Sequence, residues 1–246
     1  MNINKLWSIG DIDKAIYPAS RKTKSLSPFI SQANSADQGT IKSIGVGRLG
    51  MYASGPTSQP SDDALSEFIR SAKEKVYIFQ QDLYSQLKTE LTATFTMDAI
   101  TSAAVRGVHV TIVQSNKGDF GGYGAVEPKA TYRGVLDRAV EAFQNTGNSR
   151  DASRKLACSA ITYAPFRFSA ALSGWPQAGA KPLGTHTKLV IVDDAAFYIG
   201  SHNLYPANLQ EYGNIVFDST ATAQLNEAYW NKLWKESEPS VLPCPY

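Results

Sequence analysis

This sequence of 246 residues has little excess of either charge and no long apolar runs. The formal net charge is only +2 and no long block of like charges occurs, so neither a tail that wraps a polyanion nor an acidic solvating tail is indicated. The longest apolar stretches, such as residues 189–192, fall far short of the roughly 20 residues that a membrane-spanning helix needs. The sequence therefore predicts no helix that crosses a bilayer.

Cysteine is also scarce, because only Cys158 and Cys244 are present. No C-x-x-C pair or cluster of histidine and cysteine has the spacing of zinc ligands, so no metal is expected. The residues alone leave two interpretations open: two inert buried thiols, or a disulfide that ties the C-terminus back in an oxidising compartment. The N-terminal run MNINKLWSIGDIDKAIY carries charges where a signal peptide has its apolar segment, so no secretion signal is expected in the chain as given.

With 43% hydrophobic and 19% charged residues, the chain has the composition of a globular protein, and one domain is the simpler interpretation. Residues 1–60 are rich in serine, glycine and proline, and we expect an irregular lead-in with one strand near residues 44–52. The domain itself is predicted to span residues 61–246. It opens with a helix that Ser61, Asp62 and Asp63 are placed to cap.

The next segments alternate between helix and strand, which predicts an α/β sandwich. A strand at 76–80 follows the first helix, a second helix at 97–106 ends at Gly107, and residues 108–115 alternate like a half-buried strand. Further along, we expect helices at 129–144 and 221–234 and strands near 159–164, 188–193, 196–200 and 214–218. The glycine-rich segments 116–128 and 172–184 are predicted to be loops, the first of them over the site.

The run that carries chemistry begins at His186 and Lys188. On a regular strand these two side chains share one face, roughly 7 Å apart, with Val190 and Val192 beneath them. Asp193 then falls on the opposite face at the far end, which suits a structural carboxylate bonded to backbone better than a reacting one.

A short turn follows, and its donors complete an array suited to a tetrahedral phosphate. Lys188 supplies a positive charge, Asn203 supplies amide N–H groups, and Gly200 and Ser201 offer a hydroxyl and backbone N–H groups. His186 is the group in this set that can attack phosphorus or protonate a leaving alkoxide. Glu211 is our candidate for the carboxylate that orients an imidazole.

The spacing H-x-K-x4-D-x6-G-S-x-N resembles, at every fixed position, the HKD motif of the phospholipase D superfamily. The resemblance is closest to the C-terminal half of the secreted, Streptomyces-type enzymes. It extends to VYIFQQDLYSQ, RGVHVTIVQSN, GGYG, KLACS and the terminal Cys244, and covers roughly residues 45–246.

The resemblance implies a mixed central sheet flanked by helices on both faces and no cofactor. This sequence contains one HKD motif, so it corresponds to one HKD half. It implies that His186 is the imidazole of a second motif, that Lys188 and Asn203 hold phosphate oxygens, and that Glu211 orients an imidazole. It also implies a disulfide between the two cysteines. Because a phosphohistidine mechanism needs two imidazoles, either a homodimer or a separate chain like the N-terminal half must complete the site.

Several other side chains are assigned to the surroundings of this site. The segment of Gln81 and Asp82 is either a strand end with ordinary polar caps or part of the wall. The loop residues Phe120, Tyr123 and Trp175 suit either contact with a lipid interface or packing in the core. Two histidines are expected outside the chemistry: His202 at the rim of the turn and His109 facing solvent. Glycines of the first loop, Gly121 and Gly122, are predicted to lie near the substrate.

Three functions compete. The first is hydrolysis or transphosphatidylation of phospholipid head groups by an exported protein in peripheral contact with membranes. The second is a metal-independent endonuclease acting as a homodimer, which the nearly neutral charge disfavours, because each contacted phosphate normally needs a basic group. The third is a non-catalytic partner subunit.

Overall fold

The computed structural model describes residues 41–48, 60–83, 94–116, 127–169, 174–175, 181–182, 184–205 and 209–246. The chain divides into two compact units, Met1–Thr40 and Ile41–Tyr246, and the described residues all belong to the second. The strand expected near residues 44–52 is β1, and it is a strand of the main sheet.

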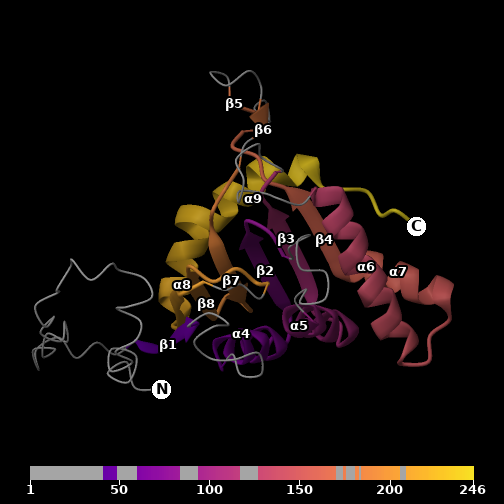
Figure 1. The fold of residues 1–246 in the computed structure, drawn as a ribbon, viewed down its shortest axis with the longest axis horizontal. Coiled ribbons are helices and arrows are strands. Elements are labelled where there is room, and N and C mark those ends of the chain that lie inside the picture. Colours follow the sequence, from indigo (N-terminus) through magenta and orange to yellow (C-terminus); the bar gives the residue numbers. More distant parts are fainter. Residues whose placement is uncertain are drawn as a thin grey trace, which may run out of the picture. The chain divides into compact units, whose positions relative to one another are not determined.

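A seven-stranded sheet forms the centre of the fold, in the order β1-β9-β8-β7-β2-β3-β4 (Figure 1). Strands β2, β3 and β4 run parallel to one another, and the other pairs are antiparallel, so the sheet is mixed. A separate two-stranded ladder pairs β5 with β6. The strands are β1 Lys42–Arg48, β2 Lys75–Gln80, β3 His109–Gln114, β4 Ile161–Pro165, β5 Gly174–Trp175, β6 Lys181–Pro182, β7 Lys188–Val192, β8 Ala196–Gly200 and β9 Glu211–Phe217.

Helices cover both faces of the main sheet. Because side chains alternate along β2, Ile78 packs in a large apolar cluster with residues of α4, α5 and α6, while Phe79 packs on the other face with Trp230 and Leu233. The predicted α/β class, with a mixed sheet between helices, is therefore confirmed. The helices are α4 Pro60–Arg70, α5 Thr94–Val105, α6 Pro128–Gln144, α7 Arg150–Ala160, α8 Ser219–Leu225, a π-helical turn η4 Asn226–Trp230, α9 Asn231–Ser237 and a 3-10 turn η5 Glu238–Ser240.

Two elements differ from the expectation. The strand β3 is buried from Val110 to Gln114 and not half-buried, because it lies between β2 and β4 under helices on both faces. The polar stretch before β4 forms the helix α7, which begins after Ser149, whose hydroxyl accepts a hydrogen bond from the N–H of Ala152. Its apolar signal is weak because its fully buried residues are only Ser153 and Ala157.

The ends of the helices also refine the prediction. Gly107 ends the α5 region with a φ of +89°, a left-handed conformation that suits glycine at a helix C-terminus. The closing helix expected at residues 221–234 begins earlier and is interrupted by the π-helical turn η4. No helix in the described ranges is both long and apolar enough to span a bilayer.

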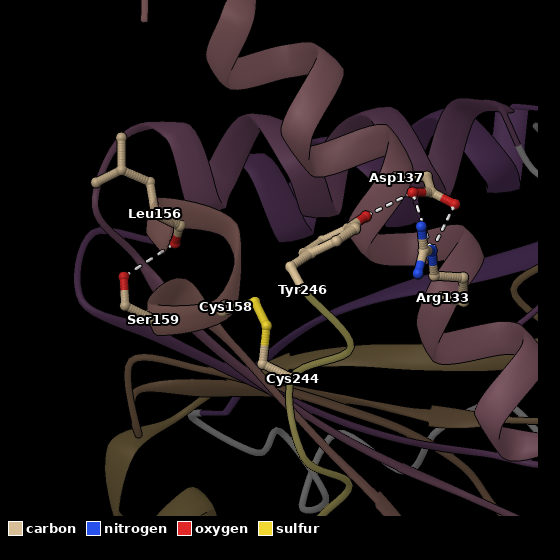
Figure 2. The surroundings of a disulfide bond; sticks show 7 residues. All are labelled: Arg133, Asp137, Leu156, Cys158, Ser159, Cys244 and Tyr246. Carbon is tan, nitrogen blue, oxygen red and sulfur yellow. Dashed lines mark hydrogen bonds and ion pairs between the residues drawn. A yellow bond between two sulfur atoms is a disulfide. The ribbon is translucent and has the colours of Figure 1, made fainter. Parts of the chain in front are cut away.

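The disulfide between Cys158 and Cys244 is present, with 5.8 Å between the two Cα atoms (Figure 2). It joins α7 to the C-terminal segment. Next to it, the hydroxyl of Tyr246 donates to the carboxylate of Asp137, which also pairs with Arg133. The C-terminus is therefore held to α6 and α7 by one covalent bond and a polar contact.

Candidate active site

Lys188 is the first residue of β7, the strand at the middle of the main sheet. Its side chain lies on the same face as Val190 and Val192, which belong to the large apolar cluster as predicted. Only 2% of Lys188 is exposed, and its ammonium donates to the carbonyl oxygen of His186 at 3.0 Å and to Oε1 of Gln81 at 3.1 Å. A lysine charge is therefore held at the sheet centre by two neutral oxygens.

Burial lowers the pKa of Lys188 to about 8, although the charges of Glu211 and Asp82 act in the opposite direction. His186 lies two positions before the start of β7, so strand alternation by itself does not set the direction of its ring. The His186 side chain is exposed, and burial followed by the charge of Lys188 lowers its pKa. Neutral imidazole is consequently favoured, which is the form that can act as a nucleophile or a base.

Asn203 follows β8 and is tied to the first residue of β9. Its backbone N–H and its side-chain Nδ2 both donate to Oε1 of Glu211, each at 3.1 Å. Asn203 is 3% exposed and Glu211 is 6% exposed, so these bonds form away from solvent. In this structure Glu211 orients an amide, and its predicted role toward an imidazole stays a prediction.

Arg48, at the end of β1, and Asp62, in α4, are site residues that sequence reasoning missed. The guanidinium of Arg48 forms buried ion pairs with Asp62 and with the second carboxylate oxygen of Glu211. The helix α4 begins at Pro60, so Asp62 lies inside its first turn and serves the arginine instead of capping the helix. Arg48 and Asp62 belong to two different elements, and neither belongs to a motif, so no sequence signal pointed to this pair.

The turn after β8 is closed by its own hydrogen bonds. Both the hydroxyl and the backbone N–H of Ser201 donate to the carbonyl oxygen of Tyr212, and the contact predicted between Ser201 and a phosphate stays a prediction. Gly200 is required by a close approach, because a Cβ there would lie 2.3 Å from the hydroxyl oxygen of Tyr198 and 2.5 Å from the Cα of Gly213. The Gly-Ser pair therefore shapes the backbone that presents Asn203.

His202 was expected at the rim, and this was wrong, because its exposed fraction is 0%. The hydroxyl of Tyr198 accepts from the backbone N–H of His202 and lies 2.7 Å from Nδ1 of the ring. This short contact joins the ring of His202 to the phenol of Tyr198 inside the fold. Burial and the charge of Arg48 lower the pKa of His202 to about 4, so this imidazole is neutral near pH 7.

The segment after β2 forms part of the wall around Lys188. Gln81 touches the ammonium directly, and Asp82 accepts from Nε2 of Gln114 at 3.2 Å. The hydroxyl of Tyr163 donates to the same Gln114, and all four side chains are buried. Of the two interpretations offered for Gln81 and Asp82, the contacts favour the wall of the site over ordinary strand caps.

Asp193 lies at the other end of β7 and has a structural position. Its carboxylate accepts from the backbone N–H groups of Lys73, Glu74 and Lys75, each at 2.9 Å. Burial acts to raise its pKa, but these three bonds outweigh it and the pKa is lowered. This is the backbone-bonded carboxylate that the alternation along the strand favoured.

The structure describes only some of the remaining predicted residues. Gly121, Gly122, Tyr123 and Phe120 lie outside the described residues, and for Trp175 only the backbone, in β5, is described. His109 is exposed as expected, with its ring 3.2 Å from the hydroxyl of Thr162. Within the described ranges, no group of three or more histidine, cysteine, aspartate or glutamate side chains is arranged to hold a metal ion.

Comparison with known proteins identifies the family. Residues 65–234 match the family model described as cardiolipin synthase, PLD-like domain. The chain belongs to the phospholipase D superfamily. It is 39% identical over 198 residues to phospholipase D of Streptomyces antibioticus, an alignment that covers 77% of this chain and 34% of that protein. The chain thus spans about a third of the length of this phospholipase D.

One solved structure shares the fold at low identity, and a second matches it more weakly. Phosphatidylserine synthase of Haemophilus influenzae superposes with a TM-score of 0.51 at 18% identity, covering 82% of this chain and 40% of that one. NUC of Salmonella typhimurium, a phospholipase D family member, gives a TM-score of 0.47 at 17% identity, covering 80% of this chain and 96% of that one.

Proposed function

We propose that the chain supplies one half of a phospholipase D-type active site that hydrolyses or transphosphatidylates phospholipid head groups. The observation that carries the proposal is the buried ammonium of Lys188, held against the backbone of the exposed His186. A cation kept out of water beside an imidazole is suited to bind an anion that the imidazole then attacks or protonates. The 39% identity to a Streptomyces phospholipase D supports phospholipid as the substrate class.

In the proposed reaction, one imidazole attacks phosphorus and forms a P–N bond while a second, protonated imidazole gives its proton to the departing head-group oxygen. Water, or an alcohol in transphosphatidylation, then loses its proton to the second imidazole and attacks phosphorus, which breaks the P–N bond. Lys188 and the amide of Asn203 bind the non-bridging oxygens throughout. His186 is the ring suited to this role in the described part of the chain, so we propose that the second ring comes from another copy or from a polypeptide like the N-terminal half.

His202 does not fill that place in the proposal. Its ring is fully buried and its Nδ1 is occupied by Tyr198, so it has no access to a phosphorus atom in the same site. The disulfide between Cys158 and Cys244 supports the proposal that the protein is exported, because disulfides persist in oxidising compartments. Peripheral contact with a membrane surface follows from the proposed substrate.

The test is choline release from phosphatidylcholine vesicles by the purified chain, with plasmid DNA as the alternative substrate and solution mass measured in parallel. Activity of a dimer alone supports the homodimer, and activity that appears only with an added N-terminal-half chain supports the split enzyme. His186→Ala is expected to abolish turnover, by about 100-fold or more, with an unchanged circular dichroism spectrum. The matched control is His109→Ala, on an exposed strand end, which should leave turnover intact.

Two outcomes contradict the proposal. Retention of more than about a tenth of the activity in His186→Ala removes the assigned role of the imidazole. Cleavage of DNA in the presence of EDTA, without choline release in any pairing, replaces the lipid substrate by a nucleic acid.

A further inference from the structure

Arg48 gathers acceptors from several separate parts of the fold. It is the last residue of β1 and pairs in register with Glu211, the first residue of β9. Its guanidinium binds the carboxylates of Glu211 and Asp62, and it also donates to the carbonyl oxygens of Asn203 at 3.2 Å and of Tyr205 at 3.3 Å. One side chain with 2% exposure therefore joins β1, α4, β9 and the turn after β8.

Asn203 is held from two sides by this arrangement. Glu211 accepts from its backbone N–H and its Nδ2, while Arg48 takes its carbonyl oxygen. Because the donors of a guanidinium lie in one rigid plane, Arg48 fixes the distance between the carboxylate of Glu211 and the backbone of Asn203. The amide that is proposed to bind phosphate thus owes its orientation to Arg48, which lies 155 positions earlier in the sequence.

The charge of Arg48 compensates two buried carboxylates, those of Glu211 and Asp62. Burial raises the pKa of both Glu211 and Asp62 above the ordinary value of a carboxyl group, and the charge of Arg48 acts against this rise in both. The charge of Asp62 raises the pKa of Glu211 further, and the charge of Glu211 in turn raises that of Lys188. The titratable groups on which the charge of Arg48 acts are Asp62 of α4, Glu211 of β9, Tyr198 of β8, and His202 and Tyr205 of the turn after β8. Without the guanidinium, the two buried carboxylates would face each other uncompensated.

We propose that Arg48 is a positioning residue for the phosphodiester reaction, which keeps Glu211 ionised and so holds the amide of Asn203 at the phosphate. The inference rests on the proposed function, because it assigns Arg48 a role in that same site. Arg48 touches no reacting atom in this account. Its effect on the phosphate passes through Glu211 and Asn203.

The test uses the full chain labelled with ¹³C at the glutamate carboxyl groups, with the signal of Glu211 assigned from the Glu211→Gln variant. The NMR titration of Glu211 is followed in three further variants. Arg48→Met removes the positive charge and should move the midpoint to higher pH, whereas Asp62→Asn removes a negative charge and should move it to lower pH. Arg48→Lys keeps the charge and should move it least.

Turnover of phosphatidylcholine is measured in the same variants, in the assembly in which the chain is active. Arg48→Lys is expected to lower kcat by between about 10 and 100-fold with little change in KM, because lysine cannot make the four bonds of the fork. The acid limb of the pH profile should move in opposite directions in Arg48→Met and Asp62→Asn. A purely structural arginine would lower stability in both without this opposite movement.

The inference is overturned if the Glu211 titration stays in place in Arg48→Met, or if that variant and Asp62→Asn displace it in the same direction. Should Arg48→Met fail to fold, Arg48→Lys and Asp62→Asn decide. The inference is then overturned if kcat is unchanged in Arg48→Lys, or if the midpoint of the Glu211 titration does not move to lower pH in Asp62→Asn. Failure of the proposed function looks different, since wild-type protein would then release no choline in any pairing.

Discussion

The positive charge of Lys188 is disfavoured by its burial. Burial lowers its pKa to about 8, from an ordinary value of 10.5. The ammonium and its neutral form are therefore close in free energy under mildly alkaline conditions. A phosphate group bound beside it would favour the ammonium, so charge and substrate binding are coupled at this residue.

We expect kcat/KM to fall on the alkaline side as pH rises through about 8, because this ratio reports the pKa values of the free enzyme. Lys188→Arg should lose this alkaline limb, since arginine stays charged, while its activity at neutral pH falls by about tenfold or more. An alkaline limb at the wild-type position in the arginine variant would contradict the assignment.

The free energy of unfolding should also depend on pH through Lys188. Because the folded pKa of Lys188 is below its unfolded value, the unfolded chain binds more protons between about pH 8 and 10.5, and the free energy of unfolding rises with pH across that window. Urea unfolding of Lys188→Met, whose side chain has no charge to bury, should lack this contribution.

Single residues also show where sequence reasoning failed. His202 stands in a turn that reads as exposed, yet the ring is buried against Tyr198 because Gly200 and Gly213 leave room for the tyrosine. Spacing also gave no sign that the hydroxyl and N–H of Ser201 bond to Tyr212 within the turn. Residue type and spacing predict which groups are present, and local packing decides which of them are still available.

At the scale of elements, the turn between β7 and β8 fastens the segment that joins α4 to β2. Asp193 and Asp194 both have a φ of +52°, a left-handed conformation that is uncommon outside glycine. The carboxylate of Asp193 takes three backbone N–H groups of that segment, and Asp194 pairs with Lys75. The turn therefore connects the central strands of the sheet to the helix that carries Asp62.

Asp193→Ala should lower the free energy of unfolding by roughly 2 kcal/mol or more, because three backbone donors lose a charged acceptor. The folded fraction should keep its kcat, since the carboxylate lies at the end of β7 that is remote from Lys188. Denaturant unfolding and vesicle turnover measure the two quantities. The difference from wild type should begin to shrink as pH falls below about 4, where the carboxylate of the unfolded chain becomes protonated, and should be lost only below the lowered pKa of the folded state.

Asp98→Ala is the matched control, because Asp98 makes an exposed ion pair with Arg138, and such pairs contribute little. A loss of turnover in folded Asp193→Ala, with no loss of stability, would make Asp193 a member of the reaction after all.

Elements were predictable where the apolar pattern is strong. The strands of the C-terminal region were expected at 188–193 and 196–200 and are found as β7 and β8, since each is a short apolar run between turns. The helix α7 was missed because it packs mainly through Ser153 and Ala157 and exposes most of its charged residues. The burial of β3 on both faces was missed because alternation within one strand does not reveal what covers it.

For the molecule as a whole, the disulfide is the long-range restraint that can be tested most directly. Cys158 and Cys244 are 86 positions apart, and in the chain-entropy account closing a loop of that length stabilises the fold by roughly 4 kcal/mol. The double variant Cys158→Ser with Cys244→Ser should lose about that much in urea unfolding. Wild-type protein with a reductant should match the variant, whereas the variant should not respond to the reductant. Equal stability with and without the bond would contradict the expected restraint.

The sequence by itself determined which segments around the motif are strands, the proximity of His186 and Lys188 along the chain, and membership of the family, because all three depend on local spacing. Only the tertiary structure decided that Arg48 serves Glu211 across 163 positions, that His202 is buried and that the hydroxyl of Ser201 bonds to Tyr212. The physical reason is that a buried charge must find its partner wherever the sheet brings one. The register of β1 against β9, which places Arg48 beside Glu211, leaves no periodic trace in the sequence.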